Sequence, residues 1–191
     1  MVEKCSSQTP LISLVLAGAL TLLAPAASLQ AQASQRLCAL VTPAELESAL
    51  GGKVTTTQPQ EIPYKKDAHN DHDGVLSLCT YKVGARSVLV VSSTQPVTAA
   101  GRQRGEAQTT AATDQLRHQG WTIQSHDFGA TKCWTGVAPA GTKSPFSPSA
   151  SCGAVKGSYF VSVTVTSTNP QDRLSMEQAK QIVDVVTERL P

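Results

Sequence analysis

The chain has 191 residues, of which 40% are hydrophobic and only 4% aromatic, and its formal net charge at pH 7 is +2. Its basic residues are scattered singly apart from Lys65, Lys66, Arg102 and Arg104. This pattern excludes a continuous basic stripe for nucleic acid and a polybasic membrane patch. The sequence also has no nucleophile elbow, no His-Glu-x-x-His zinc motif and no phosphate-binding loop.

Residues 1–33 have the pattern of a secretory signal peptide. Lys4 supplies a positive start, Leu11 to Leu23 is an apolar stretch, and residues 31–33 (Ala-Gln-Ala) form a small-x-small cleavage site. An uncleaved N-terminal anchor is the alternative, although the apolar stretch is shorter than the roughly 20 residues that span a membrane. We therefore expect an exported protein, periplasmic or extracellular, whose mature part is a single domain at residues 34–191.

The first predicted helix follows Thr42, which is a good N-cap. Pro43 falls at the first helical position, and Glu45 can complete a capping box with Thr42. Leu46 and Leu50 lie on one face, and Gly51 supplies a left-handed stop. Two helical turns do not persist alone, so this helix must dock on the rest of the domain through its apolar face.

A Thr-rich strand from 53 to 60 comes next, followed by a polar loop at 61–74. Within that loop His69, Asp71, His72 and Asp73 are the candidate metal ligands, because imidazole suits transition metals and carboxylates suit calcium. The spacing departs from the EF-hand loop, since the glycine is misplaced and the required glutamate is absent. A solvated loop without a metal is the alternative.

The remaining periodicity predicts further strands at 76–83, 87–94, 121–128, 131–138, 151–155 and 159–168. Helical spacing predicts a helix from about Gln103 to Gln119, which we expect to cover one sheet face with small side chains, and a final helix capped by Ser175 and Gln178. Strands in runs, separated by single helices, predict an α+β domain. Its antiparallel β-sheet has about six to seven strands, with three helices packed on it.

The mature chain keeps four cysteines, Cys38, Cys79, Cys133 and Cys152, which an exported protein pairs into two disulfides. Three connectivities are open. Cys133 and Cys152 flank a Pro/Gly/Ser-rich connection at 139–150 and are suited to facing positions of a hairpin, which favours pairing them and leaves Cys38 with Cys79. A zinc site is the rival interpretation, but no Cys-x-x-Cys pair is present.

The run from Cys38 to Gly52 (CALVTPAELESALGG), followed by Cys79-Thr-Tyr81, resembles a small exported domain of unknown function that is common in actinobacterial lipoproteins. Members typically begin with a Cys-x-Leu-Leu-Thr-x-x-Glu-Val helix and a glycine pair, followed by a Cys-x-Tyr strand. The likeness covers about the first third of the mature chain, and the remainder only in element order. The resemblance implies a fold but no activity. Because this sequence has no lipobox, the resemblance does not imply a membrane anchor either.

Three functions remain open. The first is a non-enzymatic binding or envelope-associated module without a cofactor, whose partner is an envelope or extracellular protein or a small ligand. Tyr64, Trp121 and Trp134 are its candidate contact residues, and the loops at 61–74 and 139–150 its candidate recognition segments. The second is metal binding by the 67–73 loop. The third is a hydrolase with a dispersed site drawn from His69, His118, His126 and Asp127.

Overall fold

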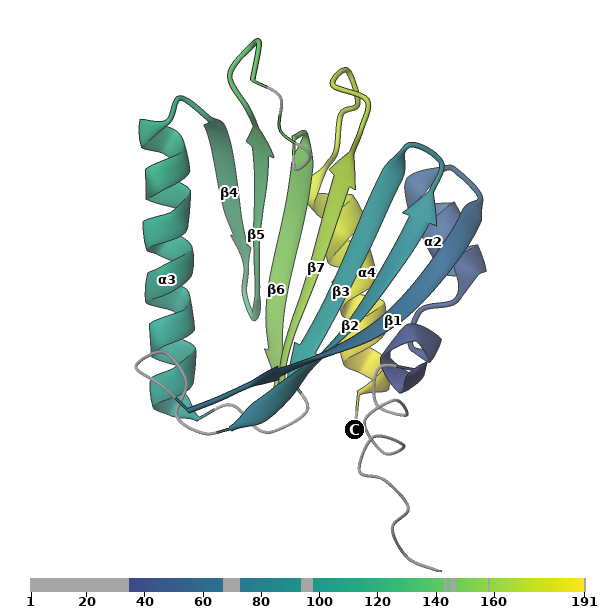
Figure 1. Cartoon of the computed structure of the whole chain (residues 1–191), viewed down its shortest axis with the longest axis vertical. Coiled ribbons are helices and arrows are strands. Elements are labelled where there is room, and N and C mark those ends of the chain that lie inside the picture. The colour runs from purple at the N-terminus through teal and green to yellow at the C-terminus, as the bar shows by residue number, and fades with distance from the viewer. Residues whose placement is uncertain are drawn as a thin grey trace, which may run out of the picture.

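In the computed structural model, seven strands form one sheet with two helices, α2 and α4, behind it (Figure 1). The structure describes residues 35–66, 73–93, 98–142, 144, 147–157 and 159–190. The strands are β1 Val54–Tyr64, β2 Gly74–Val83, β3 Arg86–Ser93, β4 Thr122–Phe128, β5 Thr131–Val137, β6 Ser149–Lys156 and β7 Tyr159–Ser167. The helices are α2 Pro43–Leu50, α3 Ala99–His118 and α4 Met176–Arg189, and residues 35–39 form a short helical turn before α2.

The strand order is β1-β2-β3-β7-β6-β5-β4, and every neighbouring pair is antiparallel. The predicted α+β class is confirmed. So are the two disulfides, Cys38–Cys79 and Cys133–Cys152. The second bridge joins residues that lie directly opposite each other on β5 and β6, which is the hairpin relationship expected from the sequence.

The predicted start of α2 is also confirmed. The Thr42 hydroxyl accepts from the Glu45 N–H at 3.3 Å, and the Glu45 carboxylate accepts from the Thr42 N–H at 2.8 Å. Gly51 takes a left-handed φ of 70° and ends the helix. Leu46 and Leu50 are buried, so packing supplies the stability that two turns lack.

The core lies between α2, α4 and one face of the sheet. Alternate residues of the inner strands supply that face, among them Val88, Val90, Val161 and Val163, each with no exposed surface. The phenol of Tyr81 is buried in the same layer and donates to the Cys38 carbonyl at 2.9 Å. The Cys-x-Tyr strand is therefore bound to the segment before α2 by a disulfide and by a hydrogen bond.

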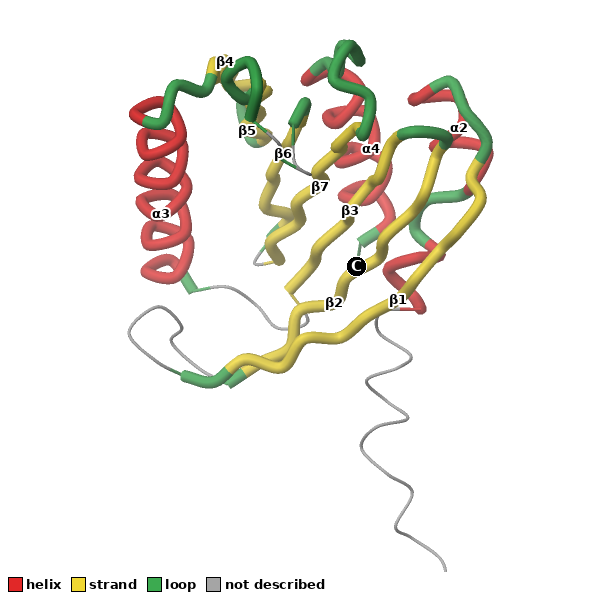
Figure 2. Tube along the Cα trace, turned by 45° about the horizontal axis from the view of Figure 1, so that its top comes forward, coloured by secondary structure: helices red, strands yellow, loops and turns green. Residues whose placement is uncertain are grey.

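The helix α3 departs from the expectation that it covers a sheet face. It contacts the edge strand β4, none of its residues is buried, and Figure 2 shows it standing beside the sheet. Its apolar residues are mostly alanines, which bury too little surface to compete with the leucines and valines of α2 and α4. It also begins four residues earlier than predicted, because Thr98 caps it by accepting from the Gly101 N–H.

Several boundaries differ from the prediction, most clearly in β1. The strand continues past Gln60 to Tyr64, so residues 61–64 are part of a long hairpin with β2 rather than a loop. The sequence assigned residues 61–64 to the polar loop, whereas β1, as an edge strand, accommodates both Pro59 and Pro63. Residues 1–33 and 67–72 lie outside the described residues, so the signal peptide stays a prediction.

Candidate functional site

The sheet has a second face, which α2 and α4 do not cover. We call it the open face and define it by the strand residues whose side chains point away from α2 and α4. Strand alternation places Leu78 and Thr80 of β2 there, while Cys79 and Tyr81 point into the core. The residues of β2 thus alternate between the two faces of the sheet, and the structure shows which of the two faces is the core.

One part of the open face is apolar. Leu78 lies opposite Val91, Ile62 lies opposite Leu76, and Phe160 lies opposite Val155. Ile62 is 40% exposed and Phe160 38% exposed, while the others are partly buried against one another. This aliphatic patch comprises Ile62, Leu76, Leu78, Leu89, Val91, Val155 and Phe160.

The adjoining part of the open face carries hydroxyl groups. The hydroxyl patch comprises Thr80, Ser87, Ser162, Thr164 and Thr166, all partly buried. Its Thr164 hydroxyl lies 2.9 Å from that of Ser151, which is itself buried. The two patches meet at Leu89, which lies between Thr80 of β2 and Thr164 of β7. Apart from Ser162, which faces Val91 of the aliphatic patch, the open face is therefore divided along its strands into an apolar and a polar region.

Three aromatic rings lie over glycines of the open face. A Cβ at Gly136 would come within 2.9 Å of the Trp134 ring, and one at Gly153 within 3.5 Å of the Phe160 ring. A Cβ at Gly74 would collide with the ring and hydroxyl of Tyr64, which lies directly opposite. Each glycine leaves room for an aromatic ring to lie against the sheet. Such ring-over-glycine pairs recur in β-sheets as aromatic rescue.

Charged side chains on the open face stand on β2, β4 and β5, and Asp127 of β4 lies opposite Lys132 of β5. Lys132 of β5 donates to Glu106 of α3 at 3.2 Å, which links the open face to that helix. Lys82 of β2 donates to the Ser87 hydroxyl. The open-face positions described on β3, β6 and β7 carry no charged side chain. The middle of this surface is therefore uncharged.

Of the predicted metal ligands, only Asp73 falls among the described residues. Both of its carboxylate oxygens are engaged, one by the Lys65 ammonium at 2.8 Å and one by the Lys66 N–H at 2.7 Å. The Asp73 carboxylate in turn raises the pKa of Lys65. His69, Asp71 and His72 lie outside the described residues, and within the described ranges no three His, Cys, Asp or Glu side chains gather as a metal site. Metal binding by this loop stays a prediction.

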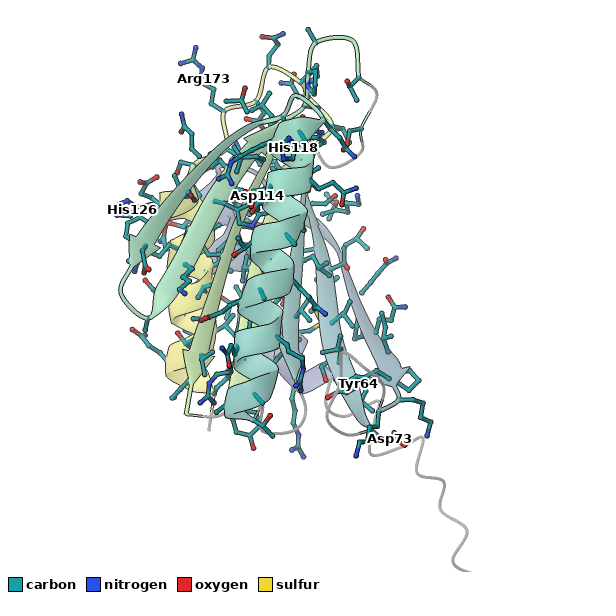
Figure 3. The ribbon with its side chains drawn as sticks, turned by 90° about the vertical axis from the view of Figure 1, so that its left-hand side faces the viewer. Tyr64, Asp73, Asp114, His118, His126 and Arg173 are labelled. Carbon is teal, nitrogen blue, oxygen red and sulfur yellow. A yellow bond between two sulfur atoms is a disulfide. The ribbon has the colours of Figure 1, made fainter. Side chains whose placement is uncertain are left out.

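The residues proposed for a dispersed catalytic site are not brought together where they are described. His118 ends α3, whereas His126 lies on β4, and Figure 3 shows the two far apart. Asp127 follows His126 and points to the opposite face, because successive strand residues alternate. His126 packs edge-on against Phe128, with the ring centroids 4.3 Å apart.

Two of the three predicted contact residues lie on the open face. Tyr64 and Trp134 lie on the open face, and Figure 3 places Tyr64 near Asp73 at the end of the β1–β2 hairpin. Trp121 follows α3, and its backbone N–H donates to the Leu116 carbonyl at 3.0 Å. The aliphatic patch was not predicted from the sequence. The sequence feature that indicates this patch is the unbroken apolar run from Val88 to Val91, which makes both faces of β3 apolar.

Two surface hollows in the described part of the chain lie away from the aliphatic patch. One, of about 90 Å³, lies between α2 and α4 and is lined by Val41, Ala49 and Ile182. The other, of about 210 Å³, is lined by Gln124, Val137 and Arg173. Both are smaller than the roughly 300 Å³ at which small-molecule pockets begin, so neither is the leading candidate for a ligand site.

The chain matches no family model and no curated protein. Among solved structures it is similar to the extracellular domain of PknH from Mycobacterium tuberculosis, with a TM-score of 0.53 and 14% sequence identity. The similarity covers 82% of this chain and 95% of that one. At this identity the likeness shows a shared fold. Among the described residues, no helix has the length and apolarity required to cross a membrane.

Proposed function

We propose that this protein is an exported, non-enzymatic binding module whose ligand rests on the open face of the sheet. The observation that carries the proposal is the aliphatic patch. An antiparallel sheet with one face in solvent normally alternates apolar inward and polar outward residues. Here Leu76, Leu78, Leu89 and Val91 are apolar at positions that point away from the core.

These side chains are not needed to fill the core, which α2 and α4 close on the opposite face. Contiguous apolar side chains left partly exposed on a soluble domain typically mark a site of interaction. In the described part of the chain, α3 contacts β4 and does not cover the aliphatic patch. A ligand is the simplest reason for keeping this surface apolar.

Export is supported by the two disulfides, which persist in oxidising compartments, and by the signal-peptide pattern. The similar solved structure is an extracellular domain, which is compatible with this location. Membership of the family common in actinobacterial lipoproteins is part of the same proposal and rests on the Cys38–Gly52 run with Cys79 and Tyr81. That resemblance carries no activity.

The proposal is tested with the mature, oxidised protein immobilised and exposed to an envelope extract of the producing cells. Bound lipids and proteins are identified by mass spectrometry. A double variant, Ile62→Glu with Phe160→Glu, charges the aliphatic patch. Val137→Glu is the matched control, since Val137 is 49% exposed and lies outside the open face.

We expect a molecule that the wild type and Val137→Glu retain and that the double variant does not. Circular dichroism of the three proteins checks that the fold is unchanged. Retention that is equal in all three, or absent from all three, would overturn the open face as the binding surface.

A further inference from the structure

The geometry points to a single amphiphilic molecule as the ligand of the open face, with a hydrocarbon tail and an uncharged, hydroxyl-bearing headgroup. This inference rests on the proposed function and names the chemical class of its ligand. It follows from the way in which apolar and hydroxyl side chains are separated along the same strands.

The aliphatic patch suits a hydrocarbon tail. Its members lie on five strands, and Ile62 and Leu76, Leu78 and Val91, and Phe160 and Val155 are facing pairs. Such pairs on one face lie about 5 Å apart. At the boundary between β3 and β7, Val91 faces Ser162, and Phe160 is the diagonal neighbour of Val91, within reach of its side chain. The Phe160 ring extends over Gly153 and widens the surface beyond its own strand. A tail laid on this patch would remove apolar surface from water on both molecules.

The hydroxyl patch suits a sugar-like headgroup. A threonine or serine hydroxyl can both donate and accept, so a row of them matches a headgroup that carries hydroxyls of its own. Thr80, Thr164 and Thr166 are partly exposed and can serve in this way. Beside them the Trp134 ring lies over Gly136 and offers a flat apolar surface at the margin of the polar region.

The distribution of charged side chains on the open face favours an uncharged headgroup. Of the lysines on this face, Lys132 is paired with Glu106, and Lys82 lies at the end of the hydroxyl patch, where it donates to Ser87 and keeps its charge. The open-face positions described on β3, β6 and β7 hold neither a cation nor a carboxylate. A phosphate or an ammonium group placed over Thr164, in the middle of the hydroxyl patch, would thus be partly desolvated without a counter-charge on β3, β6 or β7, which is unfavourable.

The dimensions fit one molecule rather than a membrane surface. From Leu76 to Lys82 the strand rises by roughly 20 Å, at about 3.3 Å per residue, which spans both patches. A bilayer surface is typically recognised by clusters of lysine and arginine, which the open face lacks. Along β2, the apolar side chains come first and the hydroxyl side chain follows. This order matches a molecule whose tail and headgroup follow one another in the direction of the strand.

The experiment uses three probes, each below its critical micelle concentration where it forms micelles. Dodecyl maltoside has both parts, maltose has the headgroup alone, and hexaethylene glycol monododecyl ether has the same tail with a headgroup poor in hydroxyls. Isothermal titration calorimetry measures binding to the mature, oxidised protein. We expect dodecyl maltoside to bind at least about tenfold more tightly than either of the others, a difference of about 1.4 kcal/mol.

Two variants separate the two patches. Ile62→Ser with Phe160→Ser should weaken both tailed probes. Thr80→Val with Thr166→Val keeps the side-chain shape and should weaken dodecyl maltoside while leaving the ether unchanged. The control Val137→Ser should bind like the wild type. Phosphatidylcholine vesicles, tested by co-sedimentation, should not bind.

Equal binding of the two tailed probes, binding to vesicles alone, or loss of binding in the Val137→Ser control would each overturn the inference. So would absence of binding by all three probes. If the wild type then still retains an envelope molecule that the Ile62→Glu, Phe160→Glu variant does not, the binding function stands and only the ligand class is wrong. If that capture also fails, the binding function itself is wrong.

Discussion

The guanidinium of Arg189, in the last turn of α4, binds the Glu45 carboxylate that closes the capping box of α2. Arg189 also donates to the Leu40 carbonyl at 2.7 Å. Arg189 of α4 thus links the end of the last helix to the start of α2. The hydrogen bond with Arg189, followed by those with Thr42, lowers the pKa of Glu45 to about 2.

This pKa predicts a loss of stability in acid. The ordinary pKa of glutamate is about 4.3, so the contribution of Glu45 is complete above that pH and disappears as the pH falls toward 2. Because the Glu45 side chain is 33% exposed, solvent screening reduces the contribution to about 1–2 kcal/mol. Glu45→Gln should lower the free energy of unfolding by this amount at pH 7 and flatten its pH dependence between about 4 and 2.

Urea denaturation at a series of pH values measures this effect. Glutamine can still serve at the third position of a capping box, so the variant isolates the charge. The double variant Glu45→Gln, Arg189→Gln should lose less stability than the sum of the two single variants, because each single variant already removes the ion pair, while only Arg189→Gln removes the hydrogen bond to the Leu40 carbonyl. Additive losses would show that Arg189 and Glu45 act independently.

The two disulfides should contribute unequally to stability. The bridge from Cys38 to Cys79 spans 41 residues and that from Cys133 to Cys152 spans 19. Chain-entropy reasoning gives about 4 kcal/mol for the longer loop and about 3 kcal/mol for the shorter. Paired Cys→Ala variants, compared by urea denaturation, should reproduce this order. If the shorter bridge proved the more stabilising, native-state packing rather than the unfolded chain would set its contribution.

The hydrogen bond from Tyr81 to the Cys38 carbonyl should be visible in both stability and titration. Tyr81→Phe leaves a buried carbonyl without its donor and should lower the free energy of unfolding by about 1–2 kcal/mol. Burial raises the pKa of Tyr81 to about 12. Stability attributable to this group is therefore present below pH 10 and falls between about 10 and 12.

Ultraviolet difference spectroscopy of tyrosinate follows this ionisation. The wild type should show a tyrosine component that titrates late, and Tyr81→Phe should lose that component. Tyr159→Phe is the control, since Tyr159 is only partly buried on β7. A late component that survived in Tyr81→Phe would contradict the assignment.

Two glycine substitutions should have opposite effects. Gly136→Ala places a methyl group 2.9 Å from the Trp134 ring and 3.1 Å from Ile123, and should lower the free energy of unfolding by about 1–3 kcal/mol. Gly105→Ala lies within α3 with nothing within 4 Å, and should favour that helix by about 1 kcal/mol. Thermal unfolding gives the first effect, and helicity by circular dichroism gives the second. A neutral Gly136→Ala would mean that the Trp134 ring is not held against the sheet.

Local patterns were sufficient wherever a residue acts on its own neighbours. Thr42, Glu45 and Gly51 fixed the bounds of α2, and alternation identified the strands, because capping and pleating depend on sequence separations of a few residues. The Pro/Gly-rich connection between Cys133 and Cys152 indicated their pairing for the same reason. The end of β1 was predicted too early, since the pairing of residues 61–64 depends on their partners in β2 and not on near neighbours.

The sequence alone therefore determined the fold class, the order of the elements and the disulfide framework. Only the tertiary structure decided which face of the sheet is core. Two helices can cover one face, and α2 and α4 bury more apolar surface than the alanine-rich α3, so the opposite face keeps its apolar side chains partly exposed. The aliphatic and hydroxyl patches arise from strands far apart in the chain, and sheet register alone brings them together.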